Sequence, residues 1–327
     1  MKQELMDKLK NHQSLVDNEC FELTIEISCM LNTLDKNKQS EGRALIIRVL
    51  DNWNNIPNSY KKIFIDLISS AGFYPYIQKL NLPLGDFSDE IRMAYHRSNN
   101  LKGKYFHSEQ KKIDELIKAH INVIVSAPTS FGKSMLIEEI VASGEYKNIV
   151  IIQPTLALLD ETRRKLKEYS SKYKIIVKTT QDYSEDKGNI FLLTAERVLE
   201  YHNMPPIQLL ILDEFYKLSN KREDNRSSIL NIAFVRLMKN PECRFYMLGP
   251  NIDSIPKGFV EKYSAVFYKT QFSMVLTESE DYYENVKIQR GGKVVEEDVF
   301  NILDAVDEQT LIYCASPSAA RKLAFSY

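Results

Sequence analysis

The sequence predicts an α/β protein in which a helical N-terminal region precedes a parallel β-sheet with flanking helices. Two observations lead to this prediction. Apolar residues recur at helical spacing through the first hundred residues, and after about residue 104 short β-rich runs alternate with amphipathic segments. A charged stretch then leads to one more apolar run. We expect a helical accessory domain at 1–103, an α/β domain at 104–277, a linker at 278–300 and the truncated start of a second α/β domain at 301–327.

The N-terminal helices are predicted from apolar residues one helical turn apart. Leu23, Ile27, Leu31 and Leu34 recur at the spacing of one helix face, and Gly72 is the expected stop of a later helix. No spacing typical of a catalytic site occurs in this region. We therefore interpret it as an accessory or partner-binding domain.

The sheet is predicted from strand–helix alternation, which implies parallel strands with helices on both faces. Chemistry-bearing loops are then expected at the carboxyl ends of the strands. The expected strands are Asn122–Ser126, Asn148–Gln153, Lys174–Lys178, Ile190–Leu193, Gln208–Leu212 and Arg244–Leu248, followed in the last domain by Thr310–Cys314. The expected helices are Lys133–Ser143, Leu156–Tyr169, Ile229–Leu237, Val295–Val306 and one from Pro317.

Composition excludes several classes of protein. The 327 residues are 44% apolar and 27% charged, which argues against a disordered or fibrous chain. Lys and Arg number 43 against 44 Asp and Glu, so the net charge of −1 gives no general attraction to nucleic acid or membranes. Apolar runs are too short to span a bilayer, the first residues mix charges and do not show the apolar core expected of a signal peptide, and the four cysteines show no paired spacing. We expect a cytoplasmic protein without a membrane partner.

The segment Ala127–Ser134 is a candidate phosphate-binding loop. Its letters A-P-T-S-F-G-K-S match G-x-x-x-x-G-K-[ST], with Ala127 at the first glycine, and the segment joins a predicted strand to a predicted helix. Lys133 is expected to reach the β- and γ-phosphates of ATP, and the Ser134 hydroxyl to bind Mg²⁺. A glycine-containing turn with a chance Lys-Ser is the alternative interpretation. The predicted ATP-binding residues here are Ala127, Pro128, Thr129, Ser130, Phe131, Gly132, Lys133 and Ser134.

Two adjacent carboxylates end the apolar run at Gln208–Leu212. Asp213 is the second expected Mg²⁺ ligand, and Glu214 is expected to accept a proton from the attacking water. Solvated acidic residues are also common at strand ends, so the pair alone is weak evidence. It becomes informative because the candidate phosphate loop lies upstream in the same sequence. With Lys133, these two residues form the predicted catalytic set.

With these motifs, the sequence resembles the DEAD/DEAH helicases of superfamily 2, and more closely their Ski2-like members. The phosphate loop is similar to motif I, and D-E-F-Y at Asp213–Tyr216 is similar to motif II. The resemblance implies that the α/β domains are RecA-like. It also gives Gln110 the role of the glutamine that contacts adenine, for which an amide is suited because it donates and accepts. Gln78 is the alternative, but it lies farther from Lys133.

The resemblance also implies binding of one DNA or RNA strand. Pro154 and Thr155 are similar to motif Ia, and Thr194 and Arg197 to motif Ib, which hold the sugar–phosphate backbone in the family. Helix N-capping is the alternative role of the two threonines. Leu248–Asp253 stands where the family has Ser-Ala-Thr, so coupling between hydrolysis and strand separation is in question, and Asn251 is the remaining polar candidate there.

Thr310–Pro317 resembles motif IV, and the later motifs with the arginine finger are absent. The whole arrangement is similar to the helicase component of Hachiman-type antiphage defence, which implies a nuclease effector docking on the N-terminal domain. The leading hypothesis is an ATP-dependent helicase or translocase in antiviral defence, only weakly active as this chain. A P-loop switch that gates a protein partner, and a non-enzymatic scaffold, are the alternatives.

Overall fold

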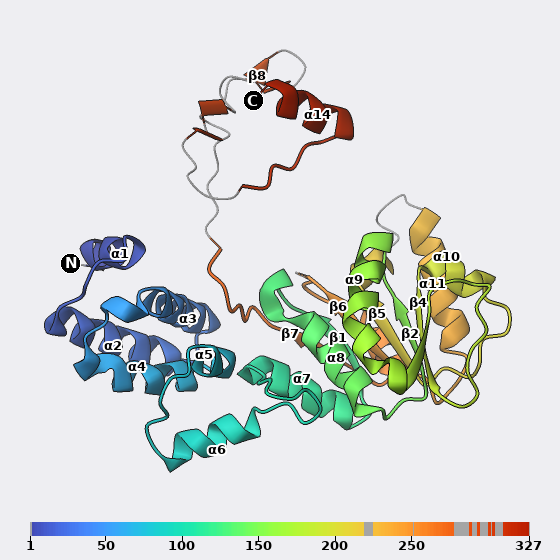
Figure 1. Ribbon diagram of the computed structural model, residues 1–327, viewed down its shortest axis with the longest axis horizontal. Coiled ribbons are helices and arrows are strands. Elements are labelled where there is room, and N and C mark those ends of the chain that lie inside the picture. Colours follow the sequence, from blue (N-terminus) through green and yellow to red (C-terminus); the bar gives the residue numbers. More distant parts are fainter. Residues whose placement is uncertain are drawn as a thin grey trace. The chain divides into compact units, whose positions relative to one another are not determined.

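The computed structural model describes residues 2–218, 225–250 and 252–277, with short stretches at 288–289, 293–294, 300–301, 303–304 and 310–326. The chain divides into two compact units, Met1–Leu276 and Thr277–Tyr327, and each is described by itself (Figure 1). Within the described ranges, no helix is long and apolar enough to cross a membrane. The bounds of the four predicted segments stay predictions, and the predicted linker lies almost wholly outside the described residues.

The N-terminal region is a set of helices packed around apolar side chains, as predicted. Leu23 and Ile27 are fully buried against residues of the next helices, such as Ile46 and Phe64. The elements are α1 (Lys2–Lys10), α2 (Asp17–Leu31), α3 (Lys36–Asp51), a 3₁₀ turn (Trp53–Asn55), α4 (Asn58–Ser70), α5 (Tyr74–Lys79) and α6 (Phe87–Tyr95).

The prediction that Leu34 shares the buried face of this helix is wrong. Helix α2 ends at Leu31, and Leu34 is 99% exposed. The amide of Asn32 donates to the Ser28 carbonyl and ends the helix, and the Asp35 side chain then caps α3 by accepting from the Asn37 N–H. A polar residue with a local hydrogen bond thus overrides the apolar spacing.

Gly72 terminates α4 in a left-handed conformation, with φ +81°. A Cβ here would lie 2.3 Å from Ser108 Oγ and 3.3 Å from Ser108 N, at the start of α7 (Ser108–Lys118). The Gly72 carbonyl also accepts from the Ser108 N–H at 3.2 Å. Only glycine allows this close approach between the N-terminal helices and the α/β part.

We expect Gly72→Ala to lower the free energy of unfolding by about 2–4 kcal/mol, because backbone strain and overpacking add. Gly103→Ala is the matched control, since Gly103 has φ +68° but nothing within 4 Å of its Cβ position. It should cost only about 1 kcal/mol. Chemical denaturation of both variants measures the difference, and equal losses would contradict a packing role for Gly72.

A seven-stranded, all-parallel sheet forms the centre of the larger unit, in the order β3-β4-β2-β5-β6-β1-β7. The strands are β1 (Asn122–Ser126), β2 (Asn148–Ile152), β3 (Tyr173–Ile176), β4 (Gly188–Leu193), β5 (Leu209–Asp213), β6 (Arg244–Gly249) and β7 (Ala265–Lys269). Six of them were predicted to within a few residues at each end. β7 was missed because Ala265–Lys269 is only partly buried at the sheet edge.

Helices cover both faces of the sheet, as predicted (Figure 1). Along β2, Ile149 and Ile151 belong to the core beneath one set of helices, and Val150 and Ile152 to the core beneath the other. The first core continues into the N-terminal helices. The first set is α7 (Ser108–Lys118), α8 (Lys133–Ser143) and α9 (Leu156–Leu166), and the second is α10 (Ala195–Glu200), α11 (Asn225–Leu237) and α12 (Lys257–Lys262).

The smaller unit confirms one prediction and contradicts another. α14 (Pro317–Ser326) forms as expected, and a short antiparallel pair joins β8 (Ile288–Gln289) to β9 (Lys293–Val294). The predicted strand Thr310–Cys314 is irregular, and Leu311 is 97% exposed. An apolar run becomes a strand only when a neighbouring strand shares its backbone hydrogen bonds, and the two sheets formed by the described residues do not include this segment. Most of the predicted helix Val295–Val306 lies outside the described residues.

Candidate nucleotide and strand-end site

The predicted phosphate loop joins β1 to α8. Thr129–Phe131 makes a 3₁₀ turn, and Gly132 follows in the left-handed region before Lys133 opens the helix. Lys133 Nζ donates to the carbonyls of Ala127 at 3.0 Å and Pro128 at 2.9 Å. Burial lowers the pKa of Lys133, and the charges of Asp213 and Glu214 partly oppose this shift. The ammonium group therefore lies over the loop, at the amino end of an eleven-residue helix.

Gln110 supports the loop from beneath. Its Nε2 donates to the carbonyls of Phe131 at 3.2 Å and Gly132 at 3.1 Å, and its Oε1 accepts from the His107 N–H at 3.2 Å. The side chain is only 3% exposed. This geometry gives Gln110 a role in positioning the loop, and contact with adenine stays a prediction. The alternative, Gln78, lies at the end of α5, where its Nε2 donates to the Gly103 carbonyl.

His107, which the sequence interpretation missed, is the second support. Its Nδ1 caps α7 by accepting from the Gln110 N–H at 3.2 Å, and its Nε2 donates to the Phe131 carbonyl at 3.0 Å. Accepting at Nδ1 requires the neutral ring, because both ring nitrogens of a protonated histidine are donors. The sequence contained a signal for this role, because His107 stands three positions before Gln110, which is the spacing of a helix capping box.

An aromatic contact series links this support to the N-terminal helices. The Phe272 ring stacks on His107 at 4.3 Å and meets Phe73 edge-on at 5.4 Å. The Arg43 guanidinium lies 5.2 Å from the same ring. The N-terminal region therefore packs directly against the groups that hold the phosphate loop.

We expect His107 to make stability fall in acid. Burial lowers its pKa from 6.5 to about 4, although the bond to the Phe131 carbonyl partly opposes this. Below pH 6.5 the unfolded chain binds a proton that the folded chain excludes, so the loss begins there and reaches about 3 kcal/mol near pH 4. Denaturant unfolding at pH 7.5 and pH 4 measures it. His107→Asn, which keeps a capping group without titrating, should lose about 3 kcal/mol less over that interval. The same loss in both proteins would disprove the assignment.

The predicted acid pair stands at the carboxyl end of β5. Asp213 Oδ2 accepts from Gln153 Nε2 at 3.2 Å, and Asp213 Oδ1 accepts from the Glu214 N–H at 3.0 Å. Burial raises the pKa of Asp213. Glu214 has φ +57°, an uncommon conformation for this residue, and its carboxylate pairs with Lys217 at 2.6 Å. The turn thus separates the directions of two consecutive carboxylates.

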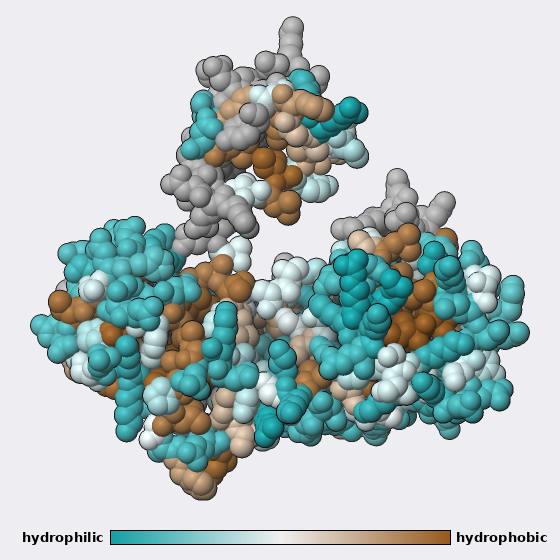
Figure 2. Space-filling model, in the orientation of Figure 1, coloured by the Kyte–Doolittle hydropathy of each residue, from teal (hydrophilic) through white to brown (hydrophobic). Residues whose placement is uncertain are grey.

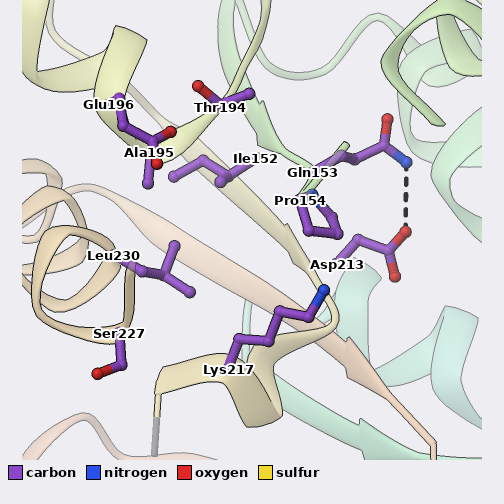
Figure 3. Close-up of a pocket in the computed structure, with 10 residues that line it drawn as sticks. All are labelled: Ile152, Gln153, Pro154, Thr194, Ala195, Glu196, Asp213, Lys217, Ser227 and Leu230. Carbon is purple, nitrogen blue, oxygen red and sulfur yellow. Dashed lines mark hydrogen bonds between the residues drawn. The ribbon is translucent and has the colours of Figure 1, made fainter. Parts of the chain in front are cut away.

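Two cavities open at this edge of the sheet. The loop cavity, about 200 Å³, is lined by Thr129, Gly132, Lys133, Ser134, Gln153 and Asp213 among others. The strand-end cavity, about 100 Å³, is lined by Pro154, Thr194, Glu196 and Lys217 and again by Gln153 and Asp213 (Figure 3). The structure therefore brings together residues from four predicted motifs, and the side chains of Gln153 and Asp213 line both cavities.

The predicted strand-binding residues differ in their surroundings. Thr155 Oγ1 accepts from the Leu158 N–H at 3.3 Å and so caps α9, which is the alternative role named above. Thr194 makes no such capping bond and lines the strand-end cavity. Arg197 is not brought to that cavity, because its guanidinium donates to the Val177 carbonyl at 3.1 Å. Strand binding by these residues stays a prediction.

The segment at the place of motif III is tied to β1. Ser126 Oγ accepts from the Ile252 N–H at 2.7 Å and donates to its carbonyl at 2.9 Å. Gly249 is packed so that a Cβ would lie 3.0 Å from the Phe215 ring. Asn251, the polar candidate of this segment, lies outside the described residues.

The residues present fit a nucleotide with Mg²⁺. This ion takes oxygen ligands, keeps several waters, and needs one or two protein groups beside the phosphates. Ser134 and Asp213 both line the loop cavity and supply a hydroxyl and a carboxylate. In the part of the chain that the structure describes, no cluster of three or more His, Cys, Asp or Glu forms an all-protein metal site.

Comparison with known proteins identifies two segments. Residues 1–90 match the family described as anti-bacteriophage protein B N-terminal domain, and residues 107–248 match the DEAD/DEAH box helicase family. Anti-bacteriophage protein B of Escherichia coli (strain K12) is 34% identical over 296 residues, which are 85% of this chain and 38% of that protein. The chain thus spans well under half the length of this relative.

Solved helicase structures resemble part of the chain. The helicase domain of Pyrococcus furiosus Hef is 15% identical, with a TM-score of 0.34 over 49% of this chain and 37% of that chain. The DUF1998 helicase MrfA is 12% identical, with a TM-score of 0.44 over 67% of this chain and 38% of that chain. The sequence matches support the predicted resemblance to DEAD/DEAH helicases over residues 107–248 and similarity to an antiphage protein, whereas the Ski2-like and Hachiman assignments stay predictions.

Proposed function

We propose, from the premise that residues 107–248 form a DEAD/DEAH box helicase domain, that this chain is the ATP-binding part of a nucleic-acid helicase or translocase in phage defence. One observation carries the proposal. The phosphate loop, the acid pair and the strand-end cavity lie at the same edge of one parallel sheet, where Gln153 and Asp213 line both cavities.

In this proposal, catalysis is positioning and charge neutralisation. The loop N–H groups at the start of α8 surround the phosphates, and Lys133 exchanges its carbonyl bonds for phosphate oxygens. Ser134 and Asp213 hold Mg²⁺, which would neutralise charge on the β- and γ-phosphates. Glu214 accepts the proton of the attacking water, and Lys217 holds its carboxylate in place.

The proposed nucleic-acid contact lies at the strand-end cavity. Pro154 and Thr194 end neighbouring parallel strands there. Binding of this kind recognises the sugar–phosphate backbone and carries little base specificity. The net charge of −1 gives no general attraction to nucleic acid. The contact therefore depends on these local groups and on a second domain that closes over them.

The test compares ATPase rates with and without single-stranded DNA or RNA, on this chain and on a version extended through the second domain. We expect this chain to bind ATP and hydrolyse it slowly, because an arginine from a second domain is worth about 10³–10⁵-fold in related reactions. The extended version should be stimulated by strands. Strand-stimulated turnover by residues 1–327 alone, equal to that of the extended version, would contradict the two-domain mechanism.

A protein-gating switch is the second candidate function. It is favoured by the segment Leu248–Asp253, which lacks the serine hydroxyl of motif III. Helix α6 also presents an exposed apolar stripe: Phe87, Ile91 and Tyr95 are spaced one turn apart and are more than half exposed. We propose that a protein effector binds this stripe. Figure 2 shows brown side chains at the tip formed by this helix. If single-stranded DNA or RNA does not change the ATPase rate of the extended version, the switch is favoured.

A further inference from the structure

Gln153 has a position that the proposed catalytic set does not explain. It directly follows β2, is only 4% exposed, and donates through Nε2 to Asp213 Oδ2 at 3.2 Å (Figure 3). Among the described residues, its other amide atom, Oε1, is buried without a hydrogen-bond partner. Burying an unpaired acceptor destabilises the fold, so a glutamine here calls for a functional explanation.

Gln153 is connected to both proposed sites, the Mg²⁺–ATP site and the nucleic-acid contact. Through its side chain, Gln153 contacts Asp213, the proposed Mg²⁺ ligand. Through its backbone, it continues into Pro154 and Thr155, the proposed strand-binding segment. Proline restricts the backbone at this junction, so a shift of the segment is transmitted to Gln153 and not absorbed between them.

We propose that Gln153 is a positioning residue that couples strand binding to the Mg²⁺–ATP site by moving and orienting the Asp213 carboxylate. The inference rests on the proposed function. A strand held at Pro154–Thr155 sets the position of the amide, and the amide sets which Asp213 oxygen faces the loop cavity. This link replaces the missing serine hydroxyl of motif III with an amide on the neighbouring strand, since β2 and β5 are paired.

Such coupling is measurable and reciprocal. If strand binding favours the Asp213 orientation that binds Mg²⁺–ATP, then Mg²⁺–ATP strengthens strand binding by the same factor. Coupling factors between sites are typically about 5–150-fold, and one hydrogen bond to a charged group is sufficient for the lower part of that range. We expect a factor of about 10 for the parent chain.

The test uses Gln153→Leu, which keeps the buried volume and removes both amide atoms. Two ratios are measured by fluorescence anisotropy and by titration with a fluorescent ATP analogue. The first ratio is the affinity for single-stranded nucleic acid with Mg²⁺–ATP divided by that affinity without nucleotide. The second ratio is the affinity for the ATP analogue with Mg²⁺ divided by that affinity in EDTA. Both ratios cancel a general loss of folded protein. In the variant, the first should fall from about 10 to below 2, and the second at least about threefold.

Gln208→Leu is the matched control. Gln208 lies at the opposite end of the same sheet, where its Oε1 accepts from the N–H groups of Lys147 and Asn148. Both ratios should keep their parental values in this variant. If both ratios also keep their parental values in Gln153→Leu, the proposal is overturned.

Failure of the proposed function has a different result. If the parent sequence, extended through the second domain, binds no single-stranded DNA or RNA, the helicase proposal and the coupling role both fall. The Mg²⁺ ratio, which needs no strand, then decides alone whether Gln153 positions Asp213 in the nucleotide site.

Discussion

Glu214→Gln in the version extended through the second domain is expected to lower ATP turnover by about 100-fold or more while ATP still binds. The amide keeps the shape of the carboxylate and its bond to Lys217, but it cannot accept a proton from water. The left-handed backbone at this position is retained, because the substitution leaves the Cβ unchanged. The variant should therefore accumulate with bound ATP.

Glu242→Gln is the control for this measurement. Glu242 is exposed and lies just before β6, at the opposite end of the sheet from both cavities. Its replacement should leave turnover within about twofold, as for a surface change that touches no reacting group. A Glu214→Gln protein that hydrolyses ATP at the parental rate would remove Glu214 from the mechanism.

Lys133→Ala should weaken ATP binding by roughly 10–150-fold, which corresponds to the loss of a charge-assisted contact of about 1.5–3 kcal/mol. The reason is geometric. The ammonium group lies over the loop at the start of α8, bonded to two loop carbonyls that phosphate oxygens are expected to replace. Isothermal titration with ATP and Mg²⁺ gives the affinity.

Lys165→Ala separates charge in the cavity from contact with phosphate. Lys165 also lines the loop cavity, but its ammonium pairs with Glu161 at 2.7 Å. Its loss should change ATP affinity by less than about threefold. Equal effects of the two lysine substitutions, or none from Lys133→Ala, would exclude the phosphate-loop assignment.

Part of the site could be predicted because its signals are local. A strand, a glycine-containing turn and a helix are consecutive in Asn122–Ser143, so the loop was identified from the letters alone. Asp213 was assigned to a strand end because the apolar run before it is short and unbroken. Local signals also misled where neighbours were needed: Leu34 is exposed, and Thr310–Cys314 is irregular.

The supports of the loop could not be predicted in this way. His107, Phe272 and Gln153 are far from the loop or the acid pair in sequence, and each acts through a contact that the fold creates. The resemblance implies that Gln110 contacts adenine, which stays a prediction, and the structure adds that its amide is bonded to the loop backbone. A hydrogen-bond partner that is distant in sequence leaves no periodic pattern to read.

The amino-acid sequence by itself determined the strand–helix alternation, the phosphate loop and the acid pair, because burial pattern and turn chemistry act between residues close along the chain. Only the tertiary structure decided the order of the strands, the two cavities that share Gln153 and Asp213, and the packing of the N-terminal helices against the loop supports. These features depend on which distant segments meet. The burial and hydrogen bonding of the whole core together decide which segments meet. No single segment of the sequence contains that information.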